Sequence, residues 1–110
     1  MPDIIDKAVF TDLQDAAGAD FVTELVDTFL VEAPHMLTEL RTAQAAGVAD
    51  RFRRAAHSLK SNSNTFSATT LAEMARDLEL GGLITDSTPL AALEAEYARV
   101  AAALKELTHG

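Results

Sequence analysis

Hydrophobic residues recur at spacings of three and four along most of the chain, which is the period of an amphipathic α-helix. The pattern is interrupted at Gly18, at Gly47 and between Gly81 and Pro89, where turn-forming residues gather. It therefore predicts five helices, at residues 5–17, 20–46, 48–66, 69–80 and 88–108. Four amphipathic helices with short connections predict an all-α antiparallel four-helix bundle, with the short first helix across one end or side. We expect residues 1–110 to form a single domain.

The second predicted helix carries two apolar rows, more than one core contact requires. The first row is Phe21, Leu25, Phe29, Ala33, Met36, Leu40 and Ala43, and the second is Val22, Val26, Leu30 and Leu37. Pro34 lies inside this helix and lacks an amide proton, which predicts a bend near Leu30. The second row must be covered either by the first helix or by a partner.

Residues suited to capping lie near the start of several predicted helices. Asp20 is placed to cap the second helix, and Thr70 with Glu73 is placed to form a capping box on the fourth. Ser87 or Thr88, followed by Pro89, is typical of a helix start and predicts the beginning of the last helix.

Composition supports a helical chain and narrows the classes of partner. The sequence has 21 Ala and 14 Leu but only 9 Val and Ile together. Its net charge of -8 disfavours nucleic acid and anionic membranes as partners, because both require clustered basic residues. The absence of Cys excludes disulfides, thiol catalysis and zinc-thiolate sites. With no apolar run of about 20 residues and no signal-peptide pattern, we expect a cytoplasmic protein.

The segment from Val48 to Ala68 distinguishes this chain from a generic bundle. At 100° per residue, seven of its residues point within about 60° of one direction and predict the core face. They are Val48, Phe52, Ala55, Ala56, Leu59, Ser63 and Phe66. His57 lies about 140° from Phe52 on this wheel, so we expect its imidazole to be exposed.

Basic charge is concentrated around this histidine. Residues 48–61 hold four basic residues and one acid, a net +3, whereas the segments before and after them carry -7 and -4. An uncharged imidazole has a nucleophilic ring nitrogen, and flanking cations would stabilise the negative charge of an arriving phosphoryl group. The nearest acid in the segment is Asp50, two turns away, so no acid–base partner is expected there. An inert surface histidine has the same local pattern, and residues 61–67 are also typical of a loop.

Three motifs resemble those of histidine-containing phosphotransfer domains. They are Ala56-His57-Ser58-Leu59-Lys60 followed by small residues and Phe66-Ser67-Ala68, the stretch from Phe29 to Pro34, and the Leu-Ala-x-x-Ala-x-x-Leu-Glu pattern from Leu71 to Glu79. The resemblance covers nearly the whole chain. It implies a four-helix bundle with an extra N-terminal helix, which relays phosphoryl groups between receiver domains.

The same resemblance implies roles for individual residues. His57 would accept a phosphoryl group on Nε2 from a receiver aspartyl phosphate and pass it to another receiver aspartate, with Lys60 beside the phosphoryl group. The receiver would supply magnesium, so no cofactor or metal is expected in this chain. Expected partners are receiver domains of response regulators, a hybrid histidine kinase, or both. The resemblance also implies a monomer. The candidate docking residues are Arg53, Arg54, Ser61, Asn64, Leu30, Pro34 and Leu37.

Two serines stand where members of this family usually have glycine. Ser61 lies four residues after the histidine, where the small side chain should still let a receiver approach, and its hydroxyl could bond a phosphoryl oxygen. Ser67 precedes Ala68, and we expect it to cap the following helix.

Other functions remain open at the level of sequence. The chain could be a phosphoacceptor domain excised from a chemotaxis-type or hybrid histidine kinase, or a non-catalytic adaptor that binds a kinase. Ser58 stands where the dimerisation domain of a sensor kinase typically has an acid. We expect a phosphotransferase intermediate without ATP binding or autokinase activity, and Met1 with the compact length favours a free-standing protein.

Overall fold

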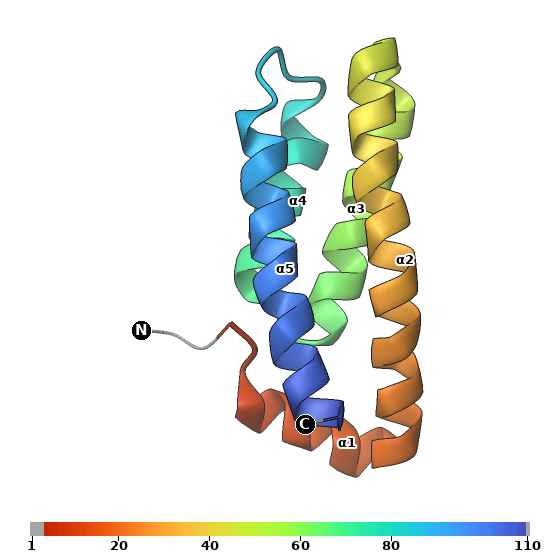
Figure 1. Cartoon of the computed structure of the whole chain (residues 1–110), viewed down its shortest axis with the longest axis vertical. Coiled ribbons are helices and arrows are strands. Elements are labelled where there is room, and N and C mark those ends of the chain that lie inside the picture. Colours follow the sequence, from red (N-terminus) through yellow and green to blue (C-terminus); the bar gives the residue numbers. More distant parts are fainter. Residues whose placement is uncertain (1–3, 110) are drawn as a thin grey trace.

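The computed structural model describes residues 4–109, and its regular structure within that range is entirely helical (Figure 1). The five helices are α1 (Lys7–Ala17), α2 (Ala19–Ala46), α3 (Ala49–Thr65), α4 (Thr69–Gly81) and α5 (Thr88–His109). Their bounds lie within two residues of those predicted from the sequence. The all-α fold class is therefore confirmed. Residues 1–3 and 110 of the predicted domain lie outside the described range.

The four long helices run alternately up and down and enclose one core (Figure 1). α2 packs on α3 and α5, and α4 packs on the same two neighbours, so that the four helices form a closed ring. α1 packs on α2 and crosses the end of the bundle at which the C-terminus also lies (Figure 1). This is the predicted antiparallel bundle with a short helix across one end.

The core face of α2 differs in phase from the predicted stripe. Its buried residues are Val22, Val26, Phe29, Ala33, Leu37, Leu40 and Ala43. These combine members of both apolar rows at spacings of three and four, so one helical face serves the core. Phe21, predicted to lie on that face, is exposed, because Val22 occupies the core-facing direction at this level.

α2 continues through Pro34 as one helix of 28 residues. Proline provides no N–H for the carbonyl of Leu30 four residues earlier. The Tyr97 hydroxyl of α5 donates a long hydrogen bond of 3.5 Å to that carbonyl. The Tyr97 ring also packs edge-on against Phe29, with the ring centroids 5.9 Å apart. The acceptor that proline leaves without a helical partner is thus satisfied by a neighbouring helix.

The ends of α2 and α3 have the same hydrogen-bond pattern. After α2, Gly47 takes a left-handed φ of 69° while the Val48 amide donates to the Ala43 carbonyl. After α3, Ser67 takes a left-handed φ of 58° while the Ala68 amide donates to the Ser63 carbonyl. Both are Schellman turns, whose left-handed position favours glycine. Ser67 therefore closes α3.

Three of the predicted helix caps are wrong. α4 begins at Thr69, and its N-cap residue Ala68 makes no side-chain hydrogen bond, so neither Ser67 nor a Thr70–Glu73 box caps it. Gly18 precedes α2, and Asp20 lies inside its first turn. At the start of α5, the Asp86 carboxylate accepts hydrogen bonds from the amide and hydroxyl of Thr88. Gly18 and Ala68 occupy the N-cap positions of α2 and α4, and neither has a polar side chain that could accept a hydrogen bond from a helix amide.

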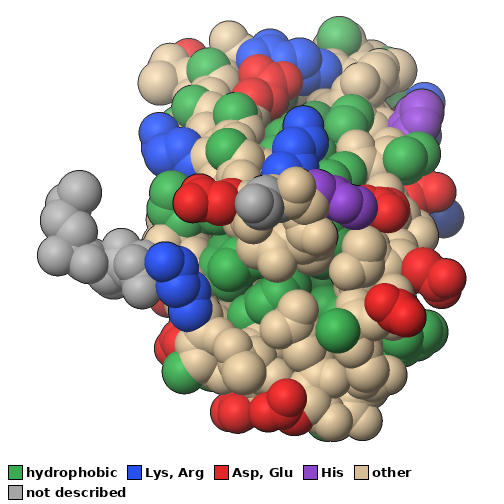
Figure 2. Space-filling view, turned by 60° about the horizontal axis from the view of Figure 1, so that its bottom comes forward, with side chains coloured by type: hydrophobic (Ala, Val, Ile, Leu, Met, Phe, Trp, Pro, Cys, Tyr) green, Lys and Arg blue, Asp and Glu red, His purple; other side chains and the backbone are tan. Residues whose placement is uncertain are grey.

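Acidic side chains dominate the end of the bundle that α1 closes. Figure 2 brings this end forward and shows acidic side chains lying among patches of apolar ones. Asp6, Asp12, Asp15 and Asp20 lie in or beside α1 and the first turn of α2. Four of the nine basic residues of the chain lie instead on α3.

None of the helices within residues 4–109 is both long and apolar enough to cross a membrane.

The two serines that replace family glycines should respond oppositely to restoring glycine. Ser67→Gly should stabilise the fold by about 0.5–1 kcal/mol, because a non-glycine residue is strained at φ 58°. Ser61→Gly should destabilise it by about 0.5 kcal/mol, because Ser61 lies inside α3 and glycine disfavours helix. Urea denaturation of both variants and the wild type measures the difference. A loss of stability in Ser67→Gly would contradict the strain at this position.

Candidate functional site

His57 lies in the middle of α3 and faces away from the core. Its side chain is 55 % exposed, whereas Phe52, Ala56 and Leu59 on the opposite face of the helix are fully buried. Val48 is the one residue of the predicted core face that is exposed. The helical wheel therefore placed both faces of α3 correctly. The imidazole is open to a partner from solvent.

Glu79 of α4 contacts both His57 and Lys60. Its Oε2 lies 2.6 Å from Nδ1 of His57, and its Oε1 lies 2.7 Å from Nζ of Lys60. The Glu79 side chain is only 12 % exposed, because α4 packs closely against α3 at this level. One carboxylate thus bridges the imidazole and the ammonium group, using both of its oxygens.

The charge of Glu79 determines which imidazole nitrogen carries the proton. The hydrogen bond from Lys60 lowers the pKa of Glu79 below its ordinary value, and the bond from His57 lowers it further, against a partial desolvation that raises it. An ionised carboxylate can only accept hydrogen bonds, so Nδ1 of His57 is the donor. In a neutral imidazole the lone pair then lies on Nε2. The structure describes no hydrogen-bond partner for Nε2, which is left available as a nucleophile.

Lys60 is held against the site rather than extended into solvent. Its side chain is 26 % exposed and lies one helical turn after His57. The ion pair with Glu79 fixes the ammonium group near the imidazole. The structure thus brings the two sequence-predicted catalytic candidates together, and Glu79 is the residue that orients both.

Glu79 was not among the site residues predicted from the sequence, because it lies outside residues 48–68, where Asp50 is the one acid. A signal was present in the fourth helix, where Ala72, Ala75 and Glu79 recur at helical spacing. Ala72 and Ala75 are buried, so the same face carries Glu79 toward α3. An acid at the end of a small-residue stripe that faces a neighbouring helix indicates a carboxylate held in a helix interface.

The basic residues of α3 are largely paired with acids. Asp50 accepts from Arg53 at 2.8 Å and lies 2.9 Å from Arg54, and its pKa is lowered by these contacts. Arg51 forms a two-point bond with Glu39 of α2, at 2.6 and 3.0 Å. The net +3 of the segment is therefore reduced by Glu39 and by Glu79, which approach from α2 and α4. Most of the predicted cationic field around His57 is locally balanced.

The structure separates the predicted docking residues into two groups. Arg53, Ser61 and Asn64 are exposed and share the face of α3 that carries His57, and Arg54 is exposed beside them. Leu37 is buried in the core, which contradicts its prediction as a contact for a partner. Its position on the core-facing stripe of α2 is the reason. Leu30 is half-buried against the core, and Pro34 is exposed.

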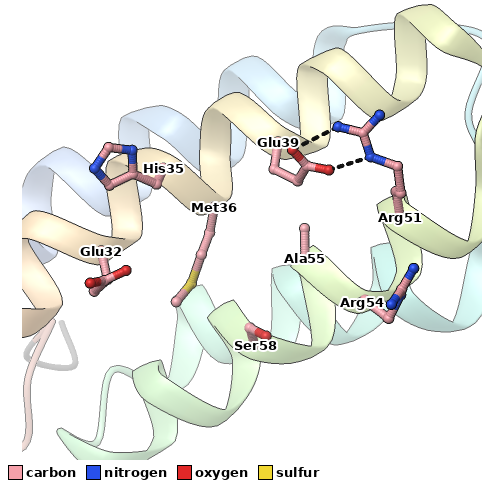
Figure 3. Close-up of a pocket in the computed structure, with 8 residues that line it drawn as sticks. All are labelled: Glu32, His35, Met36, Glu39, Arg51, Arg54, Ala55 and Ser58. Carbon is pink, nitrogen blue, oxygen red and sulfur yellow. Dashed lines mark hydrogen bonds and ion pairs between the residues drawn. The ribbon is translucent and has the colours of Figure 1, made fainter.

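A groove of about 590 Å³ runs between α2 and α3 (Figure 3). Met36 points from α2 toward the part of α3 that carries Ser58, and the Glu39–Arg51 pair crosses from one helix to the other (Figure 3). Ser58, the neighbour of His57 in the chain, also lines the groove. The remaining lining residues are Glu32, His35 and Arg54. Neither Leu30 nor Pro34 lines it, because they lie on other faces of α2.

A four-helix bundle that presents one oriented histidine from the middle of a helix, with a lysine one turn later, has the architecture of a histidine phosphotransfer domain. The Hpt domain family model matches residues 24–103, and this chain belongs to that family. Its members carry out phosphotransfer in phosphorelays, as the resemblance implied. The match covers most of α2 and all of α3 and α4, which hold the site residues.

A solved structure supports the same assignment over almost the whole chain. The histidine-containing phosphotransfer protein B (HptB) from Pseudomonas aeruginosa PAO1 is 28% identical and superposes with a TM-score of 0.83. The match covers 96% of this chain and 94% of that chain, and so includes α1 as well as the bundle. A search of curated proteins finds no significant match. Both the predicted family and the predicted fold are confirmed.

The contribution of Glu79 to stability should depend on pH. Its pKa in the folded state lies below the ordinary 4.5, so the contribution is present above that value and is lost as the pH falls through the lower, folded value. The difference in unfolding free energy between wild type and Glu79→Gln should therefore shrink as the pH falls from neutral to below 4.5. Urea denaturation across this range measures it. A difference that stays constant would show that the Glu79 charge does not join α3 to α4.

Proposed function

We propose that this protein accepts a phosphoryl group from a receiver aspartyl phosphate onto Nε2 of His57 and transfers it to the aspartate of another receiver. The observation that carries the proposal is the hydrogen bond of 2.6 Å between Nδ1 and Glu79. It commits the ring proton to the buried side of the imidazole and leaves the Nε2 lone pair facing solvent. Membership of the Hpt family supports phosphotransfer as the reaction.

The transfer requires no proton to move within this protein. Nε2 of His57 attacks the phosphorus, the N–P bond forms, and the bond from phosphorus to the receiver's carboxylate oxygen breaks. The imidazole becomes a cation that keeps its Nδ1 proton, and the receiver aspartate leaves as a carboxylate. In the onward step a second carboxylate attacks the same phosphorus, and neutral imidazole leaves. Glu79 accepts a hydrogen bond from the same Nδ1 proton in both steps.

Lys60 supplies the nearest cation to the transferred group. It is fixed by Glu79 one turn from His57, and a phosphoryl group on Nε2 would bring strong acceptor oxygens close to its ammonium group. Ser61, exposed four residues after His57 on the same face, offers a hydroxyl to the same oxygens. The resemblance assigns magnesium to the receiver, and no cluster of His, Asp and Glu within residues 4–109 is placed to hold a metal ion.

The receiver docks on the exposed face of α3 and over the groove that joins it to α2. The apolar contact comes from Met36, and the charged rim from Arg54 and Glu32. Arg53, Ser61 and Asn64 extend this surface along α3 past His57. Pro34 and Leu30 stay predictions for its edge. A receiver docked over the groove would lie beside His57, because Ser58, the next residue in the chain, lines the groove.

His57 should be the one residue of this chain that accepts a phosphoryl group from a receiver. Incubation with a phosphorylated receiver should give acid-labile, base-stable phosphate on the wild type and none on His57→Gln. Phosphate and mass analysis of the separated proteins measures the transfer. His57→Gln should keep wild-type helicity, since the side chain is exposed. Label that persists on this variant would exclude His57 as the acceptor.

A bulky residue beside His57 should block docking without unfolding the bundle. Ser61→Trp places a large side chain on the exposed face of α3, and we expect receiver affinity to fall by about tenfold or more. Ala102→Trp is the matched control, on an exposed position of α5, and should bind as the wild type does. Calorimetry with an unphosphorylated receiver measures both. Equal affinity for the two variants would place the interface elsewhere.

The two alternative functions give different results in the same assays. A phosphoacceptor domain of a kinase would be phosphorylated by an ATP-binding domain added in trans and would only donate to receivers. A non-catalytic adaptor would bind its kinase equally well with His57→Gln. The intact arrangement of Glu79, His57 and Lys60 favours the phosphotransfer protein over the adaptor, because binding alone requires no oriented imidazole.

A further inference from the structure

We infer that Glu79 makes His57 a strong phosphoryl donor, because its carboxylate holds the Nδ1 proton of the imidazole and competes with the phosphoryl group for Lys60. The place of this effect in a relay rests on the proposed function, whereas the effect of Glu79 on the phosphohistidine itself does not. The inference predicts that the phosphorylated protein passes its phosphoryl group on rapidly and stores little of it. Glu79 does not touch the phosphorus and is a positioning residue.

The first step concerns the leaving group. When the N–P bond breaks, its electron pair returns to Nε2. If Nδ1 is protonated, neutral imidazole leaves, whereas without that proton the product would be an imidazolate anion. Oε2 of Glu79, 2.6 Å from Nδ1, stabilises the protonated and cationic ring of the phosphohistidine. The carboxylate therefore favours the form of the ring that releases its phosphoryl group.

The second step concerns Lys60. In the unphosphorylated protein the ammonium group is 2.7 Å from Oε1 of Glu79. A phosphoryl group on Nε2 attracts the same ammonium group, so phosphorylation must draw Lys60 away from Glu79 or share it between two anions. Neutralising Glu79 would free Lys60 for the phosphoryl oxygens. The phosphohistidine is thus less stable in the wild type than it would be beside a neutral residue.

The direct electrostatic effect of Glu79 on the phosphohistidine has two contributions of opposite sign. The carboxylate attracts the ring cation, which is close, and repels the phosphoryl dianion, which has twice the charge but lies across the ring. These two contributions oppose each other. The competition for Lys60 then decides the equilibrium, and the Nδ1 proton decides the rate of release. Both make His57 a better donor.

Glu79→Gln separates charge from shape, because the amide has the same size and its oxygen can still accept from Nδ1. The full-length variant and wild type are phosphorylated with phosphoramidate, whose N–P bond breaks to release ammonia as Nε2 is phosphorylated. We expect the phosphohistidine half-life, followed by ³¹P NMR, to be about fivefold longer in Glu79→Gln, corresponding to a weakened ion pair.

Glu94→Gln is the matched control. Glu94 forms an equally short two-point pair with Arg41, which joins α2 to α5. Its loss therefore removes an interhelical carboxylate pair without touching His57. We expect the phosphohistidine half-life in this variant to equal that of the wild type within about twofold. A general loosening of the bundle would instead change both variants alike.

Two results would overturn the inference. One is a phosphohistidine half-life in Glu79→Gln within about twofold of the wild type. The other is a ¹⁵N spectrum of the unphosphorylated wild type that places the imidazole proton on Nε2, a measurement that needs no variant to fold. The inference is supported if the wild type carries its imidazole proton on Nδ1 and if the phosphohistidine half-life is longer in Glu79→Gln but not in Glu94→Gln.

Receivers provide a separate readout that tests the proposed function at the same time. At equilibrium with a phosphorylated receiver, the share of phosphate on His57 should be about fivefold larger in Glu79→Gln than in the wild type. If wild type takes phosphate from phosphoramidate but from no receiver, the proposed function fails. If both transfers occur and Glu79→Gln leaves half-life and equilibrium unchanged, only the role of Glu79 fails.

Discussion

The contact between α3 and α4 at Glu79 is the interaction on which the site depends. α3 supplies His57 and Lys60, one turn apart, but an isolated helix would leave the imidazole free to rotate and to exchange tautomers. Glu79 binds both side chains from a neighbouring helix, at 2.6 and 2.7 Å. The nucleophile is therefore oriented by tertiary packing, and a change in how α4 lies against α3 would act directly on Nε2.

Charge at the site is arranged by the same packing. The sequence concentrates Arg51, Arg53, Arg54 and Lys60 within ten residues of one helix, which suggests a strongly cationic surface. In the fold, Glu39, Asp50 and Glu79 pair with all four of these residues. The pairs leave a surface of alternating charges rather than a uniform positive field. Such a surface favours recognition of one complementary partner over general attraction of anions.

Local features of this protein were predictable from its sequence, and features that join distant segments were not. The exposure of His57 and the burial of Phe52 follow from helical phase alone, and the structure confirms both. Glu79 lies 22 residues from His57, so their contact requires the rotation of α4 against α3, which periodicity does not determine. Leu37 was wrongly predicted as a partner contact because α2 has two apolar rows, and only the packing of the helices determines which residues of these rows are buried. Ser67 adopts a left-handed φ that residue type alone does not indicate.

Burial differs sharply across the imidazole, and this asymmetry matters most in a complex. Glu79, which contacts Nδ1, has a side chain that is 12 % exposed, whereas the His57 side chain is 55 % exposed. A docked receiver would cover Nε2 without reaching Glu79. Excluding water from the site lowers the local dielectric and strengthens the effect of a fixed carboxylate on the ring and on Lys60. In the proposed transfer, the influence of Glu79 is therefore greatest while a docked receiver covers His57.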